Sequence, residues 1–190
     1  MKILEITDNP LPIVYLDLDG VLCDFFSEWA KLAGVAINAQ NRYDYHGIPA
    51  GMREPTLDKM GGTDFFSRLP KFSTADQLVQ LVIQNFGSYS VCSSPLRGDH
   101  TNCAYHKKKW IANHLHPPPA EIIITPHKGK YAVQPNGAPN ILIDDRGKNI
   151  IEWNAAGGIG IKYQADEDSL DVVIRGLANA KEQLKMDSLR

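Results

Sequence analysis

Two aspartates stand two residues apart in the stretch VYLDLDGVLCDFF, which covers residues 14–26. The run before them, Ile13 to Leu16, is β-branched and aromatic, which is typical of a short buried strand. Side chains two apart in a strand point to the same face, so Asp17 and Asp19 should lie side by side. At about 4 Å, two carboxylates repel each other by roughly 4 kcal/mol at an effective dielectric constant near 20. A shared proton, a metal ion or a cationic partner must therefore offset their charge.

Four further runs have the composition of short strands, and helical patterns lie between them. These strand-like runs cover residues 88–93, 121–125, 140–144 and 159–163. Helices are expected over residues 74–86, 102–115 and 148–156, and an apolar stripe from Leu170 to Leu184 predicts a C-terminal helix. Strands that alternate with helices predict a parallel sheet covered on both faces.

The alternation of strands and helices breaks after the first strand. Residues from about Ala33 to Ser73 are rich in Gly, Pro, Met and aromatic residues and show no strand pattern. We interpret this part as an insertion, partly helical, that lies above the sheet as a cap. The predicted fold is therefore α/β, a Rossmann-like parallel sheet of about five strands flanked by helices. Its core would comprise residues 1–24 and 74–190, and a small, mainly helical cap would comprise residues 25–73.

Polar residues follow the predicted strands where a site is expected. In open parallel α/β sheets, sites form at the carboxyl ends of the strands. The first four runs end in, or lead into, Asp17 and Asp19, Ser93 and Ser94, Lys128, and Asp144 and Asp145. Carboxylates without nitrogen or sulfur ligands suit a hard cation such as Mg²⁺. With Asp19 protonated, Mg²⁺ and Lys128 balance the other three aspartates, so the site would admit a phosphate dianion beside a carboxylate nucleophile.

The ordered motifs DLDGVL, VCSSP, TPHK and LIDD resemble the four signatures of the haloacid dehalogenase superfamily. They cover about half of the chain, from the first strand to the fourth. Within that superfamily, DGVLCDFF, CSSPLR and IDDR are similar to the 5′(3′)-deoxyribonucleotidases and their phage-encoded relatives. The resemblance implies phosphoryl transfer to an aspartate, with Mg²⁺ as the cofactor.

This resemblance implies a role for each motif carboxylate. Asp17 matches the nucleophile that forms an aspartyl-phosphate, and Asp19 matches the general acid and base. The Mg²⁺ ligands would be Asp17, Asp144 and the backbone carbonyl of Asp19. Asp145 would support them by orienting metal-bound water or the lysine.

Other motif positions imply contacts with the substrate. The phosphate-binding groups would be Ser93, Ser94 and Lys128. Lys130 competes with Lys128 for the third motif, and spacing from the strand favours Lys128. Arg97 matches a further substrate contact, and Phe25 matches an aromatic residue that packs on the nucleobase.

Aromatic residues near the cap leave two interpretations open. Phe25, Phe26 and Trp29 share a helical spacing, and such a stripe packs in a core more often than it binds a base. The same choice between lining a pocket and packing the cap applies to Tyr43, Tyr45, Phe65 and Phe66.

Composition limits the function classes. The 190 residues include 20 basic and 22 acidic side chains, a net charge of −2, which gives no strong signature for nucleic acid or an anionic membrane. No apolar stretch approaches the length of a membrane span. Three cysteines without CxxC spacing argue against a disulfide framework, so a cytoplasmic location is expected.

These observations predict a Mg²⁺-dependent phosphomonoesterase whose substrates are nucleoside monophosphates, deoxy forms included. One alternative keeps the chemistry but acts on a sugar phosphate or a 3′-phosphorylated nucleic-acid end. Another is a nucleotide-binding module without turnover. The base, sugar and phosphate position, the pathway and the oligomeric state, a homodimer included, stay open. The cap is expected to close over the ligand and set specificity.

Overall fold

The computed structural model describes residues 11–36 and 47–187. One sheet of five parallel strands has the order β3-β2-β1-β4-β5, so β1 lies at its centre. The strands are β1 (Val14–Leu16), β2 (Ser90–Ser93), β3 (Ile122–Ile124), β4 (Ile141–Asp144) and β5 (Ile159–Lys162). The predicted α/β fold with a Rossmann-like parallel sheet is confirmed.

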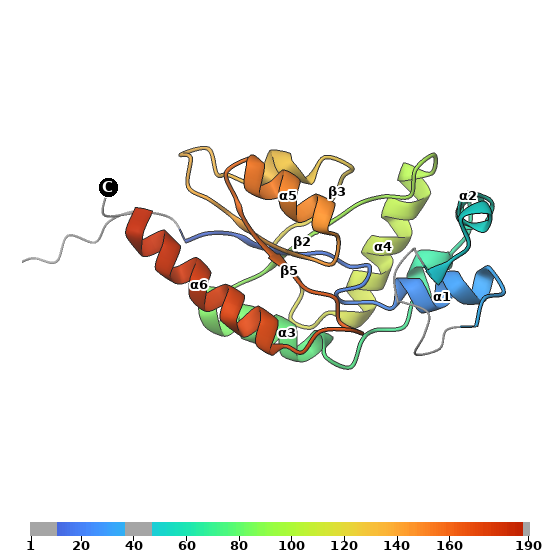
Figure 1. Cartoon of the computed structure of the whole chain (residues 1–190), viewed down its shortest axis with the longest axis horizontal. Helices are drawn as coiled ribbons and strands as arrows, with labels where there is room; N and C mark the ends of the chain where they lie inside the picture. The colour runs from blue at the N-terminus through green and yellow to red at the C-terminus, as the bar shows by residue number, and fades with distance from the viewer. Residues whose placement is uncertain (1–10, 37–46, 188–190) are drawn as a thin grey trace, which may run out of the picture.

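Helices cover both faces of this sheet. They are α1 (Phe25–Leu32), α2 (Ala50–Asp58), α3 (Ala75–Phe86), α4 (His100–His114), α5 (Gly147–Ala155) and α6 (Asp171–Asp187), with short 3₁₀ helices η2 (Phe65–Ser67) and η3 (Lys128–Tyr131). Figure 1 shows α5 on one face of the sheet and α3 and α6 on the other, with α1 and α2 beyond one end. Within the described ranges, every helix is too short or too polar to cross a membrane.

The central strand shows why both faces are apolar. Val14 and Leu16 are buried in the larger core cluster, which also contains residues of α3 and α6. Tyr15 points to the opposite face, where its ring meets Trp153 of α5 edge-on, with centroids 5.7 Å apart. A strand with helices on both sides needs apolar side chains at every position, which accounts for the unbroken apolar run.

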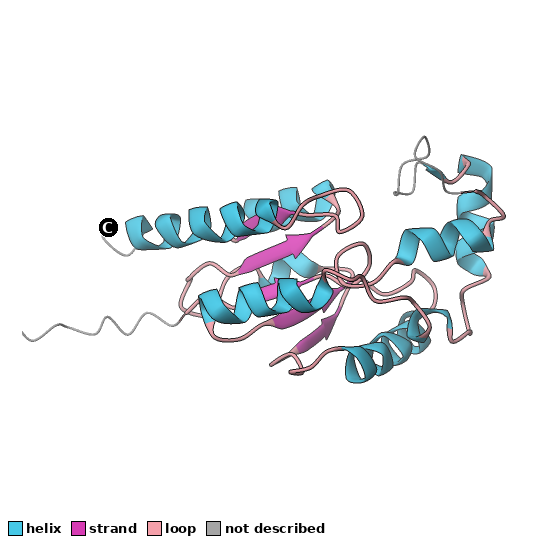
Figure 2. Cartoon of the chain, turned by 90° about the horizontal axis from the view of Figure 1, so that it is seen from below, coloured by secondary structure: helices cyan, strands magenta, loops and turns pink. Residues whose placement is uncertain are grey.

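The insertion after β1 is helical, as predicted, with α1, α2 and η2 at the end of the sheet seen on the right of Figure 2. Trp29 Nε1 donates a hydrogen bond of 2.7 Å to Thr56 Oγ1, which joins α1 to α2. Trp110 Nε1 of α4 donates one of 2.7 Å to the carbonyl oxygen of Leu69. The end of the insertion is therefore tied to the core. Residues 37–46, which include Tyr43 and Tyr45, lie outside the described residues.

Candidate active site

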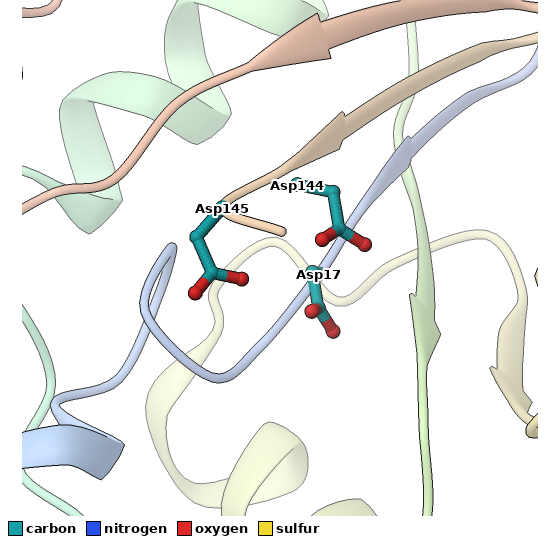
Figure 3. Close-up of side chains that lie close together, drawn as sticks. All are labelled: Asp17, Asp144 and Asp145. Carbon is teal, nitrogen blue, oxygen red and sulfur yellow. The ribbon is translucent and has the colours of Figure 1, made fainter. Parts of the chain in front are cut away.

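Three aspartate side chains converge at the carboxyl ends of β1 and β4 (Figure 3). Asp17, Asp144 and Asp145 are buried, and one carboxylate oxygen of each lies within 4.8 Å of the others. The strand register explains this meeting, because Leu16 pairs with Ile143 and the next residue of each strand is an aspartate. Parallel pairing of two motifs far apart in the sequence thus builds the acidic cluster.

A glycine in the loop after β1 lets Asp145 approach this cluster. Gly20 has φ +77°, a left-handed conformation that side chains rarely adopt. A Cβ atom added there would lie 2.7 Å from Oδ2 of Asp145. The glycine of DLDGVL therefore allows both the turn and the close approach of Asp145.

Lys128 lies between two of the carboxylates. Its Nζ atom is 2.6 Å from Oδ2 of Asp144 and 3.0 Å from Oδ2 of Asp17, and the side chain is buried. Lys130, the alternative for the third motif, is exposed. Of the two lysines, only Lys128 is therefore placed to contact a phosphoryl group at Asp17.

A second buried lysine, Lys107 of α4, was not among the predicted site residues. Its Nζ atom is 2.6 Å from Oδ2 of Asp19, 2.9 Å from Oγ of Ser93 and 2.8 Å from the carbonyl oxygen of Ser94. The sequence does hold a signal for it. Lys107 shares a helix face with Cys103, Trp110 and Ile111, which are buried. A lysine at helical spacing from apolar residues is expected to face the core and not the solvent.

Asn149 of α5 is the other residue that sequence reasoning missed. Its Nδ2 atom lies 3.0 Å from both carboxylate oxygens of Asp144, and the backbone N–H of Arg146 donates to Oδ1 at 2.9 Å. These donors hold the Asp144 carboxylate in one orientation. A tighter reading of IDDRGKN, in which α5 begins directly after the acidic pair, could have found it.

The two aspartates of the DLD motif have opposite electrostatic environments. Burial alone would raise the pKa of Asp17, but Lys128 and Lys107 hold that pKa below its ordinary value. Burial raises the pKa of Asp19, with repulsion from Asp17 adding to it and Lys107 opposing it. Asp17 is thus kept as a carboxylate, while Asp19 is the easier of the two to protonate.

The charges of the site suit a bound divalent cation. Four carboxylates and two ammonium groups leave two negative charges when all are ionised. Burial raises the pKa of Asp145 well above its ordinary value, and the charges of Asp144 and Asp17 add to the effect. The cluster of Asp17, Asp144 and Asp145 offers oxygen ligands alone, the donor set that Mg²⁺ prefers. These residues therefore fit the predicted ion.

A pocket of about 850 Å³ lies over the acidic cluster, between the sheet and the insertion. Residues of the insertion that line it include Phe25, Phe26, Trp29, Leu57 and Phe66. Phe25 and Phe66 stack with centroids 6.0 Å apart and an interplanar angle of 6°. Phe25 is only 9% exposed, so it both packs in the core and forms part of the pocket wall.

The predicted substrate contacts Ser94 and Arg97 line the same pocket. Arg97 is at the exposed rim, where its Nη2 atom is 2.6 Å from Oε2 of Glu54 in α2. This ion pair joins the loop after β2 to the insertion. All the predicted site residues therefore border one pocket or the cluster beneath it, with Ser93 and Lys128 in the buried layer.

No protein-family model and no curated protein matches this sequence. Solved structures do match its fold. A haloacid dehalogenase-like family hydrolase from Xanthomonas campestris matches with a TM-score of 0.54 and 11% identity, over 91% of this chain and 94% of that chain. A hydrolase from Streptococcus pneumoniae TIGR4 matches with a TM-score of 0.53 and 14% identity, over 86% and 98%.

A third similar structure is the L-2-haloacid dehalogenase from Xanthobacter autotrophicus with chloropropionic acid covalently bound. Its TM-score is 0.51 at 13% identity, over 89% of this chain and 83% of that chain. The protein thus has the haloacid dehalogenase-like fold, which agrees with the motif resemblance. At this low identity the likeness is one of fold, and function must be argued from the site.

Proposed function

We propose that the protein is a Mg²⁺-dependent phosphomonoesterase that forms an aspartyl-phosphate on Asp17. The observation that carries the proposal is the buried Asp17 carboxylate, which is held as an anion by Lys128 and accompanied by a second, more easily protonated aspartate, Asp19. A nucleophile and a proton donor side by side are the two groups that cleavage of a phosphate ester requires. The haloacid dehalogenase-like fold supports the same chemistry.

In the first step, a carboxylate oxygen of Asp17 attacks the phosphorus of the bound ester. The bond between phosphorus and the ester oxygen breaks, and that oxygen takes the proton of Asp19. In the second step, water attacks phosphorus and gives a proton to Asp19. The bond between phosphorus and the Asp17 oxygen breaks, orthophosphate leaves, and the carboxylate of Asp17 and the protonated Asp19 are restored.

The remaining groups hold the phosphoryl oxygens, where the charge of phosphoryl transfer resides. Lys128 and Ser93 lie next to Asp17 and would bind two of these oxygens. Asp17, Asp144 and Asp145 would hold Mg²⁺, which would neutralise charge on the phosphoryl group. Because the Asp145 carboxylate belongs to this cluster, we propose it as a Mg²⁺ ligand, in addition to its expected role of orienting metal-bound water or the lysine.

The pocket supports a substrate with a flat, apolar part. Phe25 and Phe66 line the same pocket as Asp17, on the side of the insertion, and their stacked rings form an aromatic part of its wall. The volume of about 850 Å³ falls in the range of sites for drug-sized ligands and exceeds the needs of orthophosphate. We therefore place nucleoside monophosphates first among the substrates, ahead of sugar phosphates and 3′-phosphorylated nucleic-acid ends.

Dehalogenation is the second candidate, because a similar structure holds chloropropionic acid covalently bound. Asp19 argues against it. A halide leaves as a stable anion without a proton, whereas an alcohol leaving group needs one. A half-buried proton donor close to the nucleophile therefore favours ester cleavage.

The test is product release across a panel of nucleoside monophosphates, sugar phosphates, 3′-phosphorylated oligonucleotides and 2-chloropropionate, with Mg²⁺ and with EDTA. We expect Mg²⁺-dependent phosphate release from monophosphates, and its loss in Asp17→Asn. Chloride release without phosphate release would overturn the proposal. Phosphate release from sugar phosphates or oligonucleotides alone would keep the mechanism and replace the substrate. Nucleotide binding without release of any product would favour a binding module.

A further inference from the structure

We propose that Lys107 is a positioning residue that sets the direction of hydrogen bonding at both Ser93 and Asp19. The inference rests on the proposed phosphatase function and adds a residue to it that the four motifs do not contain. It assigns to α4 a part in the reaction besides packing.

The contacts of Lys107 use its whole donor capacity. An ammonium group has three N–H donors and no acceptor. The three acceptors within reach are Oδ2 of Asp19 at 2.6 Å, Oγ of Ser93 at 2.9 Å and the carbonyl oxygen of Ser94 at 2.8 Å. The side chain is 2% exposed, so water does not compete for these donors. Lys107 therefore holds all three groups at once.

This arrangement decides what the Ser93 hydroxyl can donate to. Because the ammonium group cannot accept, Ser93 must be the acceptor of their hydrogen bond, and its own hydrogen has to point elsewhere. The Ser93 hydroxyl is close enough to Asp17 to lower the pKa of that carboxyl, so we infer that the hydroxyl hydrogen points toward Asp17. A phosphoryl oxygen arriving at Asp17 would meet this hydrogen already aimed at it. Lys107 thus makes Ser93 a donor toward the reacting group.

The same logic applies to the general acid. Lys107 engages Oδ2 of Asp19 at 2.6 Å, whereas Oδ1 receives only a weak contact from the Cys23 thiol at 3.7 Å, so Oδ1 is the oxygen that carries the exchanged proton. Side-chain rotation that would swap the two oxygens breaks a charged hydrogen bond of 2.6 Å in a buried site. The proton is therefore delivered from a fixed atom.

The insertion covers Lys107 from the pocket side. The Nζ atom lies 5.1 Å from the ring centroid of Phe66, within the range of a cation–π contact. His106, the neighbouring residue, meets Ser67 Oγ through Nδ1 at 3.2 Å. The segment that carries the pocket aromatics thus also shields the ammonium group from water.

The experiment compares Lys107→Met with Lys108→Met in the full chain. Lys108 is exposed on the same helix, so its variant controls for the loss of one lysine. Initial rates with Mg²⁺ are measured on a nucleoside 5′-monophosphate, whose leaving alkoxide needs a proton, and on p-nitrophenyl phosphate, whose leaving phenolate does not. Thermal unfolding of each variant checks that it is folded, and Lys107→Gln, which keeps two N–H donors without the charge, is the second variant.

We expect Lys107→Met to lower kcat on the nucleotide by about 10²-fold or more, the usual contribution of a positioned acid, with a clearly smaller loss on p-nitrophenyl phosphate. In an Asp19→Asn background the same change should add no more than the smaller loss seen on p-nitrophenyl phosphate, because the part of the effect that acts through Asp19 is already gone and only the part through Ser93 remains. Equal losses on both substrates, additive losses in the double variant, or activity equal to that of Lys108→Met would overturn the inference. A wild-type protein that turns over neither phosphate would overturn the proposed function instead.

Discussion

Replacing Lys128 by Met should destabilise the fold by an amount that depends on pH. The ammonium group lies 2.6 Å from Asp144 and 3.0 Å from Asp17, and all three side chains are at most 6% exposed. Removing one partner from a buried ion pair costs about 3–5 kcal/mol, because the remaining charge stays unpaired. Met has similar length and no charge, so the loss should reflect electrostatics more than packing.

The pH dependence follows from the two carboxylates. Without Lys128, burial and mutual repulsion raise the pKa of Asp17 and Asp144 above that of the unfolded chain. Groups whose folded pKa is raised bind protons more tightly in the folded state, so stability falls as pH rises through that range. The loss in Lys128→Met should therefore be full near pH 8 and smaller near pH 5.

Urea unfolding followed by circular dichroism, in EDTA, measures these differences. Lys130→Met is the matched control, since Lys130 is exposed two residues away, and its stability should stay within about 0.5 kcal/mol of wild type. Adding Asp144→Asn to Lys128→Met should recover part of the loss by removing one unpaired charge. If Lys128→Met matches Lys130→Met near pH 8, the electrostatic account of the site is wrong.

Three further outcomes are expected. Mg²⁺ should raise the Tm of the wild type more near pH 8 than near pH 5, because burial raises the pKa of Asp145 and protons then compete with the metal for it. Scanning fluorimetry should find this Tm shift lost in Asp145→Asn. A retained shift would show that Asp145 is not a metal ligand. Burial raises the pKa of Asp166 from 3.8 to about 6, and its Oδ2 has no hydrogen-bond partner among the described residues. The charge of Asp166 therefore lowers the free energy of unfolding above that pH range. Asp166→Asn should raise the free energy of unfolding by about 1 kcal/mol near pH 8, a figure reduced for partial exposure, and should leave it unchanged near pH 4. A gain that does not depend on pH would contradict this. The exposed Arg97–Glu54 ion pair should contribute under about 1 kcal/mol to stability. Arg97→Ala should therefore raise KM and leave kcat and stability nearly unchanged. A large fall in kcat would show that Arg97 takes part in the chemical step.

The sheet and its helices could be predicted because their signals are local. Buried strands such as β4 are unbroken apolar runs, and α3 places Leu78, Val79 and Val82 at helical spacing. Parallel pairing then brings strand ends together, which is why motifs at residues 17 and 144 could be expected to meet. Local periodicity and one topological rule sufficed for this part.

Beyond the helical spacing of Phe25, Phe26 and Trp29 in α1, the insertion gave no such signal. Helix α2 contains Pro55 and has one buried residue, Thr56, so it lacks the apolar stripe that marks an amphipathic helix. Its position depends on tertiary contacts, among them the hydrogen bond from Trp29 and the ion pair between Arg97 and Glu54. The predicted division into a core of residues 1–24 and 74–190 and a cap of residues 25–73 stays a prediction.

Lys107 was missed because a run of three lysines, Lys107 to Lys109, is most often a solvated surface. The helical spacing of Lys107 from Cys103 and Trp110 was a signal against that interpretation, and in the fold Lys107 turns inward, toward Asp19 and Ser93, while the next two lysines stay exposed. The charge balance drawn from the motifs alone therefore lacked one cation. Motif residues were found by type and order, whereas this residue is defined by which face of α4 meets the site.

Whether Asp17 takes the phosphoryl group is tested most directly by locating that group on the chain. p-Nitrophenyl phosphate labelled in its phosphate, whose leaving phenolate needs no proton from Asp19, is mixed with excess Asp19→Asn protein and Mg²⁺, quenched in acid and digested. This variant should accumulate the phosphoenzyme, because the base that activates water is missing. We predict label on the peptide that contains Asp17, and no label on that peptide when the Asp17→Asn substitution is combined with Asp19→Asn in the same chain. Release of labelled orthophosphate by the wild type, with no labelled peptide in either protein at any time, would contradict covalent catalysis by Asp17.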